Sequence, residues 1–156
     1  PIVEERWFES KEVEGYVPHG HDLKAGERFK DYNLKSPDGS NTTQLYDLLT
    51  GSEHELLIFT GAEPEDMEIQ EITKISESVK EYGSLIETHL LIGSKEIPEG
   101  LPELPSTWID KDHNMHKDFG AAKASLYLIR PDGYIAFRNQ PASTSDLREY
   151  LVKLFN

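Results

Sequence analysis

The fold is indicated by one segment that joins a strand directly to a helix, Glu55-Leu-Leu-Ile-Phe-Thr60-Gly-Ala-Glu-Pro-Glu-Asp66. Its first half is a short, continuous apolar run, which is typical of a central strand buried on both faces. Its second half places Pro64 and several carboxylates where a helix begins, and both suit a first helical turn. An apolar stripe at helical spacing then extends toward a stop at Gly83, formed by Ile69, Ile72, Ile75 and Val79.

The chain before this unit supplies a weaker pattern. We predict a strand around residues 32–34, a tight turn at residues 36–39, and a short helix capped by Asn41 or Thr42 and ended by Gly51. Residues 1–22 show no repeating apolar pattern, so we predict an N-terminal extension or interdomain linker there. The folded domain is then residues 23–156.

The chain after this unit predicts four more strands, at residues 85–92, 107–109, 125–130 and 134–138. Asp112 is expected to cap a short helix that stops at Gly120. Ser143 or Ser145 is expected to cap a terminal helix. Early parallel strands followed by a late hairpin and helix predict an α/β fold of thioredoxin-like, peroxiredoxin type. This is a three-layer sandwich with a mixed central sheet.

The chain contains no cysteine. Redox members of this fold hold a thiol where the long helix begins, because the helix dipole lowers the pKa of that thiol. Here residues 60–66 occupy that place without a CxxC motif, and Ala121-Ala-Lys-Ala124 stands where the fold usually has a proline. The sequence therefore predicts a redox-inactive scaffold.

Charge and hydropathy exclude further classes. Acidic residues outnumber basic ones by 29 to 16, giving a net charge of −13 that repels nucleic acid. No apolar run approaches the roughly 18 to 20 residues of a membrane span, and residues 1–10 do not resemble a secretory signal. We therefore expect a cytoplasmic protein with neither nucleic acid nor membrane as partner.

The most specific segment is Leu126-Tyr-Leu-Ile-Arg-Pro-Asp-Gly-Tyr-Ile-Ala-Phe-Arg138. With Asp112 and Phe119-Gly120 upstream, it resembles the C-terminal signature of FAD-dependent aromatic-ring hydroxylases of the phenol, polyketide and hydroxyphenylpropionate hydroxylase type. The signature residues, to which we assign a structural or docking role, are Arg130, Pro131, Asp132, Gly133, Tyr134, Phe137 and Arg138.

The resemblance implies a parent monooxygenase that uses FAD and NAD(P)H. Its C-terminal domain would be non-catalytic, would pack on the flavin-binding domain of the same polypeptide, and would contribute to a homodimer. This chain has no glycine-rich dinucleotide fingerprint, so we expect it to hold no cofactor itself. The alternative is a stand-alone cysteine-free binding module that uses a cleft around residues 60–66. The reading frame upstream of Pro1 would separate the two.

Four groups of residues suggest other chemistry, and each has a simpler explanation. His19 and His21, and His113 and His116, offer imidazoles to a metal, but no third ligand has suitable spacing. Ser143 with Asp146 lacks a neighbouring base, and a helix cap accounts for it. The carboxylates of residues 63–68 suit a solvated helix start. We therefore predict no catalytic, cofactor-binding or metal-binding residue in the chain, and a core position for Trp108.

Overall fold

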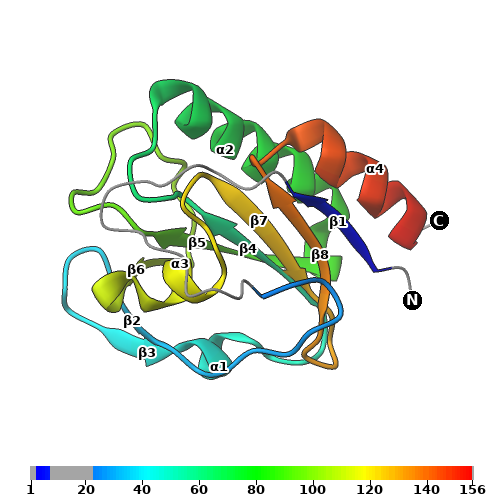
Figure 1. Ribbon diagram of the computed structural model, residues 1–156, viewed down its shortest axis with the longest axis horizontal. Coiled ribbons are helices and arrows are strands. Elements are labelled where there is room, and N and C mark those ends of the chain that lie inside the picture. The colour runs from blue at the N-terminus through cyan, green and yellow to red at the C-terminus, as the bar shows by residue number, and fades with distance from the viewer. Residues whose placement is uncertain (1–2, 8–22, 156) are drawn as a thin grey trace.

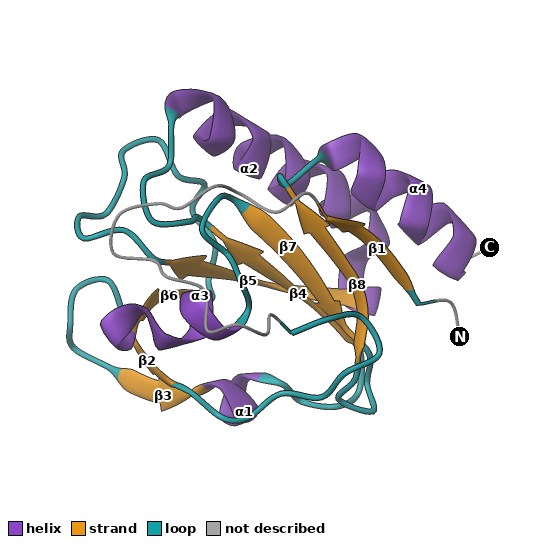
Figure 2. Cartoon of the chain, viewed as in Figure 1, coloured by secondary structure: helices purple, strands orange, loops and turns teal. Residues whose placement is uncertain are grey.

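The computed structural model describes residues 3–7 and 23–155, and these form three layers (Figure 1). A mixed sheet of eight strands lies between two pairs of helices, in the order β1-β8-β7-β4-β5-β6-β2-β3. Helices α2 and α4 cover one face, and the short helices α1 and α3 cover the other (Figure 2). This is the predicted α/β sandwich.

The strands are β1 (Glu4–Trp7), β2 (Asn33–Lys35), β3 (Thr42–Gln44), β4 (His54–Phe59), β5 (Ile86–Ile92), β6 (Thr107–Asp110), β7 (Ser125–Ile129) and β8 (Ile135–Gln140). The α-helices are α1 (Leu45–Leu48), α2 (Asp66–Val79), α3 (Asn114–Asp118) and α4 (Thr144–Phe155), with 3₁₀ turns at Lys80–Leu85 and Lys111–His113. Strands β4, β5 and β6 are parallel, and β7 is antiparallel to both β4 and β8. The apolar run and the signature hairpin therefore lie side by side at the centre of the sheet.

Two apolar cores follow from the alternation of side chains along β4. Leu56 and Ile58 face α2 and α4, while Leu57 and Phe59 face α1 and α3. The predicted stripe of α2 is buried throughout, at Ile69, Ile72, Ile75 and Val79. None of the described helices is both long enough and apolar enough to cross a bilayer.

Three details of the predicted helix starts are wrong. Residues 42–44 form strand β3, so neither Asn41 nor Thr42 caps α1. Pro64 precedes the N-cap of α2, because Glu65 holds that place in a reciprocal capping box with Glu68. Asp112 has a φ of 57° inside the 3₁₀ turn and caps no helix.

The N-terminal strand β1 pairs in parallel with β8, from Glu4 opposite Phe137 to Trp7 opposite Gln140. Thus residues 4–7 of the segment predicted as an extension or linker join the sheet as an edge strand. Residues 1–2 and 8–22 lie outside the described residues, and the domain boundary at residue 23 stays a prediction.

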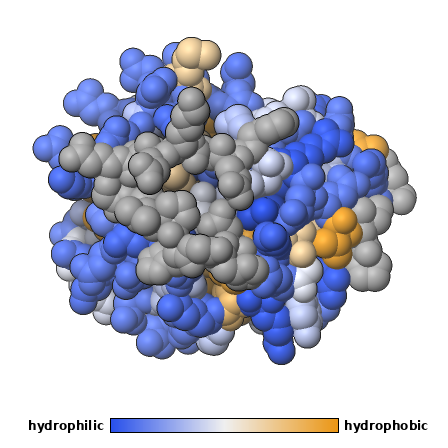
Figure 3. Space-filling view, in the orientation of Figure 1, coloured by the Kyte–Doolittle hydropathy of each residue, from blue (hydrophilic) through white to orange (hydrophobic). Residues whose placement is uncertain are grey.

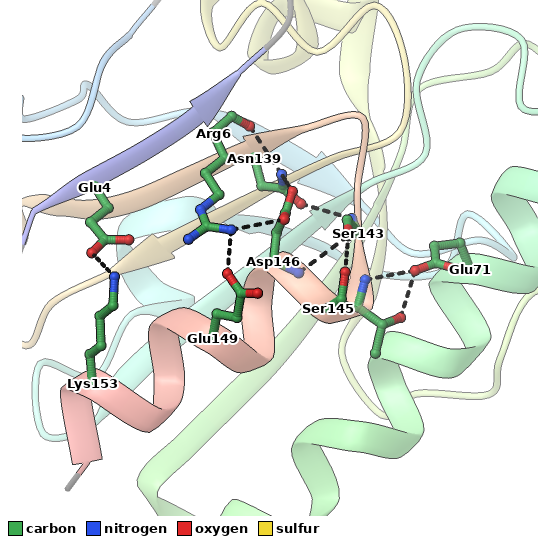
Figure 4. A network of polar contacts seen from close by, with 10 residues as sticks. Glu4, Arg6, Glu71, Asn139, Ser143, Ser145, Asp146, Glu149 and Lys153 are labelled. Carbon is green, nitrogen blue, oxygen red and sulfur yellow. Dashed lines mark hydrogen bonds and ion pairs between the residues drawn. The ribbon is translucent and has the colours of Figure 1, made fainter.

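Ion pairs connect β1 to helix α4 (Figure 4). Arg6 reaches Asp146 at 3.1 Å and Glu149 at 2.5 Å, and Lys153 reaches Glu4 at 2.8 Å. At the start of α4 the Ser143 hydroxyl accepts the Asp146 N–H at 3.2 Å, which is the predicted cap. The described residues that are visible in the same orientation are mostly hydrophilic, in keeping with the acidic composition (Figure 3).

Candidate functional site

The place where this fold carries redox chemistry lies just after β4, and here it is closed by hydrogen bonds. The Thr60 hydroxyl accepts the Gly93 N–H at 2.9 Å and donates to the Gly61 carbonyl at 2.9 Å. The Gly61 N–H donates to Nε2 of His116 at 3.3 Å. A Cβ added to Gly93 would lie 2.3 Å from that nitrogen, so only glycine leaves room for the imidazole.

The His116 ring is fixed from its other side by Asp110. Nδ1 lies 2.8 Å from Oδ2 of Asp110, and the two side chains are 0% and 1% exposed. Because Nε2 accepts a backbone N–H, we assign the ring proton to Nδ1, which donates to the carboxylate. The Asp110 oxygens also accept the N–H groups of Met115 and His116, at 3.0 and 2.6 Å. Asp110 therefore accepts the N–H groups at the start of α3, the capping role that we predicted for Asp112.

The structure does not bring the predicted imidazole pair together as a metal site. His116 is buried against Asp110, while His113 has a φ of 58° at the start of α3. Asp118 is more than a surface charge, because it accepts the Tyr32 hydroxyl at 2.7 Å and pairs with Lys30 at 3.1 Å. Burial and that acceptor raise the pKa of Tyr32. His19 and His21 lie outside the described residues.

The remaining candidates also have structural explanations. The Glu68 carboxylate accepts the N–H groups of Glu65 and Ala124, at 3.1 and 3.0 Å. Asp146 accepts from Arg6 and from Asn139, so it does not activate Ser143. Trp108 is only partly buried and packs against the core beneath α3.

The signature hairpin is mostly used for packing. Arg138 is buried and donates from Nε to Glu5 at 2.8 Å and from Nη1 to the Leu23 carbonyl at 3.0 Å. Its guanidinium lies over the Trp7 ring at 4.2 Å. Arg138 thus ties β8 to β1 and to the chain at residue 23. Phe137 stacks on Tyr150 of α4 with ring centroids 4.7 Å apart.

The tip of the hairpin is a tight turn at the surface. Gly133 has a φ of 88°, as the Pro-Asp-Gly sequence predicts. Arg130 donates from Nε to Asp132 at 3.0 Å and lies over the Tyr134 ring at 5.5 Å. This ion pair lowers the pKa of Asp132.

Comparison with protein families gives one match, which spans residues 22–156 and is described as "Aromatic-ring hydroxylase, C-terminal". The chain belongs to this family. A comparison with curated protein sequences gives no significant match.

Comparison with solved structures shows that the domain has a thioredoxin-like fold. The thioredoxin domain of a thiol-disulfide oxidoreductase from Bacteroides vulgatus has a TM-score of 0.62 and 14% identity, covering 86% of this chain and all of the other. A thiol:disulfide interchange protein from Chlorobium tepidum gives 0.63 and 14%, with the same coverage. A thiol peroxidase from Chromobacterium violaceum gives 0.61 and 12%, covering 86% and 88%. These three proteins are named for thiol chemistry, whereas this chain has no cysteine.

The turn of the hydroxylase signature lines a pocket of about 300 Å³. Arg130, Pro131, Asp132 and Gly133 form one wall. The other walls come from before β2 and from around α1 and β4, and comprise Arg28, Phe29, Tyr46, Leu49, Gly51, Glu53, Glu55 and Ile129. Sequence reasoning had assigned no pocket to this turn.

A second buried histidine lies behind that pocket, and sequence reasoning missed it. His89 is 4% exposed, and its Nε2 lies 2.8 Å from Oε1 of Glu55, which is 1% exposed. Its Nδ1 lies 2.5 Å from the Ser106 hydroxyl, which also accepts the Trp108 indole N–H at 2.9 Å. Glu87 stands opposite Glu55 in the parallel register. Loss of hydration and the Glu55 charge raise the pKa of Glu87.

The order of hydroxyl, imidazole and carboxylate in Ser106, His89 and Glu55 is that of a nucleophilic triad. However, the pocket that Glu55 lines includes neither Ser106 nor His89, so it does not give a substrate access to the hydroxyl. The sequence signal was Glu55 at the start of one apolar run, with Glu87 and His89 two residues apart in the strand that follows. That signal appears only once β4 and β5 are known to pair.

Proposed function

We propose that this domain carries out no reaction and serves a flavin-dependent aromatic-ring hydroxylase as a docking domain. It packs against the flavin-binding domain of the same polypeptide and contributes to a homodimer in the cytoplasm. FAD and NAD(P)H bind in the rest of that enzyme. One observation carries the proposal: the place where redox relatives hold a thiol contains a closed hydrogen-bond network of Thr60, Gly61, His116 and Asp110.

The turn of the signature hairpin supports the docking role. Asp132 is half exposed at its tip, and Arg28 and Arg130 both lie against the Tyr134 ring, at 4.9 and 5.5 Å. Arginine and tyrosine are enriched in protein interfaces, because each joins a large contact area to a polar tip. We therefore place the contact with the flavin-binding domain at this turn.

The absence of chemistry is tested on the purified chain. We expect no turnover of insulin disulfide or of hydrogen peroxide beyond the rate without protein, because the chain lacks the thiolate that redox proteins of this fold use for both reactions. We also expect no flavin absorbance to remain after gel filtration with FAD. A thioredoxin serves as the positive control for disulfide reduction. Protein-dependent turnover that survives a chelator would contradict the proposal.

Docking is tested by sedimentation velocity with the flavin-binding part of the enzyme added as a separate chain. We expect a complex that weakens when Asp132→Lys reverses the charge at the turn. Glu99→Lys makes the same charge change at an exposed residue beside a different pocket, and it should leave the complex intact. Failure of the unaltered chain to associate would reject the docking role.

A second candidate function is favoured by a separate pocket. Ala62, Glu63 and Pro64 line a hollow of about 930 Å³ together with residues 93–99 and His113. Its size is within the range of ligand sites, and it lies where a cleft was predicted. A stand-alone binding module would use this pocket for a peptide or small ligand. Shifts in the amide spectrum confined to residues 93–99 on ligand addition, without association with a flavin domain, would favour it.

A further inference from the structure

We propose that Glu55, Glu87 and His89 form a binding site for one divalent transition-metal ion. The site goes beyond the docking role, since it lies within the domain and does not depend on a parent enzyme. Each residue offers one ligand atom, and these atoms all lie within 4.8 Å of one another. Two carboxylate oxygens and one imidazole nitrogen are an established ligand set for such ions.

The sheet itself brings these ligands together. Glu55 and Glu87 are opposite each other in the parallel pair of β4 and β5, and His89 is two residues further along β5. Side chains two residues apart point to the same face of a sheet. Thus all three stand on one face, on backbone fixed by the most central strands. Rigid elements of this kind hold ligands more precisely than loops do.

The charges around the site favour the binding of a cation. Two carboxylates meet here. Glu55 accepts the Thr50 N–H at 3.1 Å, and its one ion pair within the described chain is with His89. Glu87 has no ion pair with any described residue. The other ion pairs of residues 3–7 and 23–155 use different carboxylates. Like charges held close on a partly buried surface disfavour their own ionised form. A divalent ion would balance both carboxylates at once.

The surroundings of His89 suit a ligand histidine. Ligating imidazoles donate their second N–H to a neighbouring acceptor, which fixes the ring and the tautomer. The Ser106 hydroxyl lies 2.5 Å from Nδ1 and is itself held by the Trp108 indole N–H at 2.9 Å. With its proton on Nδ1, the ring turns the Nε2 lone pair toward Glu55. Ser106 is therefore a positioning residue in this proposal.

The distances indicate which ions fit. Nε2 of His89 and Oε1 of Glu55 are 2.8 Å apart. Two ligands about 2.1 Å from one ion at that separation subtend an angle of about 90°, as neighbours do in octahedral coordination. The imidazole favours a transition metal over Mg²⁺ or Ca²⁺. Glu55 also lines the pocket beneath the hairpin turn, which gives a hydrated ion a route to the carboxylate.

The experiment uses the full chain, freed of metal with a chelator that is then removed. Mn²⁺ binding is followed by the paramagnetic resonance signal of the free ion, and Zn²⁺ and Mg²⁺ binding by calorimetry. We expect one Mn²⁺ or Zn²⁺ per chain in this site, and binding of Mg²⁺ weaker by about tenfold or more. Absence of saturable binding of either transition metal would overturn the proposal, leaving a shared proton to balance the carboxylates.

Three variants locate the site. Glu87→Gln keeps the shape of a half-buried side chain and should lower affinity by about tenfold or more, and Ser106→Ala should lower it by about tenfold. Glu81→Gln removes the same charge at an exposed residue outside both pockets and should leave the metal affinity unchanged. Far-UV circular dichroism checks that each variant is folded. If Glu87→Gln binds as the unaltered chain does, the proposal is wrong.

The sequence holds a second source of imidazoles, so one more variant is needed. His19 and His21 form a His-Gly-His segment that can itself bind metal ions. We expect the double variant His19→Gln, His21→Gln to keep the site that Glu87→Gln weakens. Loss of all binding in the double variant would place the metal at the N-terminal segment and reject the site on β4 and β5.

Discussion

Two buried histidine–carboxylate pairs lie on one face of the sheet, at opposite ends of β4 and β5. Each joins a ring nitrogen to a carboxylate oxygen at 2.8 Å, in His116 with Asp110 and in His89 with Glu55. Their surroundings differ. Asp110 also accepts two backbone N–H groups. Glu55 accepts one, from Thr50 at 3.1 Å, but it also faces a second carboxylate at Glu87. The same contact is thus structural where only donors surround the carboxylate, and a candidate ligand site where a second carboxylate stands beside it.

The largest loss of stability is expected from a substitution beside the His116–Asp110 pair. Gly93→Ala would place a Cβ 2.3 Å from Nε2 of His116 and force the buried ring to move. The ring would lose its bond from the Gly61 N–H, so we expect a loss of about 3 kcal/mol in the free energy of unfolding. Urea unfolding measures it. Gly83→Ala is the control for backbone strain without a steric clash, because no atom lies within 4 Å of that added Cβ. Its φ of 53° and ψ of −128° should cost about 1 to 3 kcal/mol.

The second-largest loss of stability is expected from removing the charge of Asp110. Asp110→Asn replaces one acceptor oxygen with an NH₂ group that faces N–H donors, so we expect a loss of about 2 kcal/mol. Asp112→Asn makes the same change two residues later at an exposed position with positive φ, which asparagine tolerates. The control should unfold at the same urea concentration as the unaltered chain. Equal effects of the two changes would mean that the Asp110 pair is not the closed network described above.

Beside the His89–Glu55 pair, a substitution should raise the free energy of unfolding instead of lowering it. In metal-free protein near neutral pH, Glu87→Gln removes the repulsion between two carboxylates and should stabilise the fold, by less than about 1 kcal/mol. Thermal unfolding in the presence of a chelator measures this small gain. A clear loss of stability would show that Glu87 has favourable partners, and the two histidine pairs would then be alike in their electrostatics.

The smallest effect concerns a carboxylate that is exposed but surrounded by donors. Asp38, in the turn after β2, accepts the Ser40 hydroxyl at 2.6 Å, the Ser40 N–H at 2.9 Å and the Ser36 hydroxyl at 2.8 Å. These bonds, those of Ser40 first, lower the pKa of Asp38 to about 2. Its stabilisation is then present above the pKa of an unfolded aspartate, about 3.9, and is lost as the pH falls toward 2.

Unfolding of Asp38→Asn between pH 7 and pH 2 checks that sign. The variant should be slightly less stable at pH 7, and the difference should close in acid as Asp38 of the unaltered chain takes up a proton. A difference that stays constant down to pH 2 would mean that the carboxylate charge contributes nothing. Glu87 provides the contrast, since its pKa is raised and not lowered.

Structural features that depend only on residues close together in the sequence were predictable. The stripe of α2 follows from its helical period, and the positive φ of Gly133 follows from the Pro-Asp-Gly sequence. The predicted caps at Asn41 or Thr42 and at Asp112 failed, because sheet pairing took residues 42–44 into β3 and the buried Asp110 took over the start of α3. Local preference decides a short element only when no tertiary contact competes for it.

The fold class, the lack of a thiol and the turn of the signature hairpin therefore follow from the amino-acid sequence. Which polar side chains meet depends on the tertiary structure. Arg138 reaches Glu5 across 133 residues, His116 reaches Gly61 across 55, and His89 reaches Glu55 across 34. The reason is that period and turn chemistry act over a few residues, whereas strand order and register bring distant positions together only when the whole sheet packs.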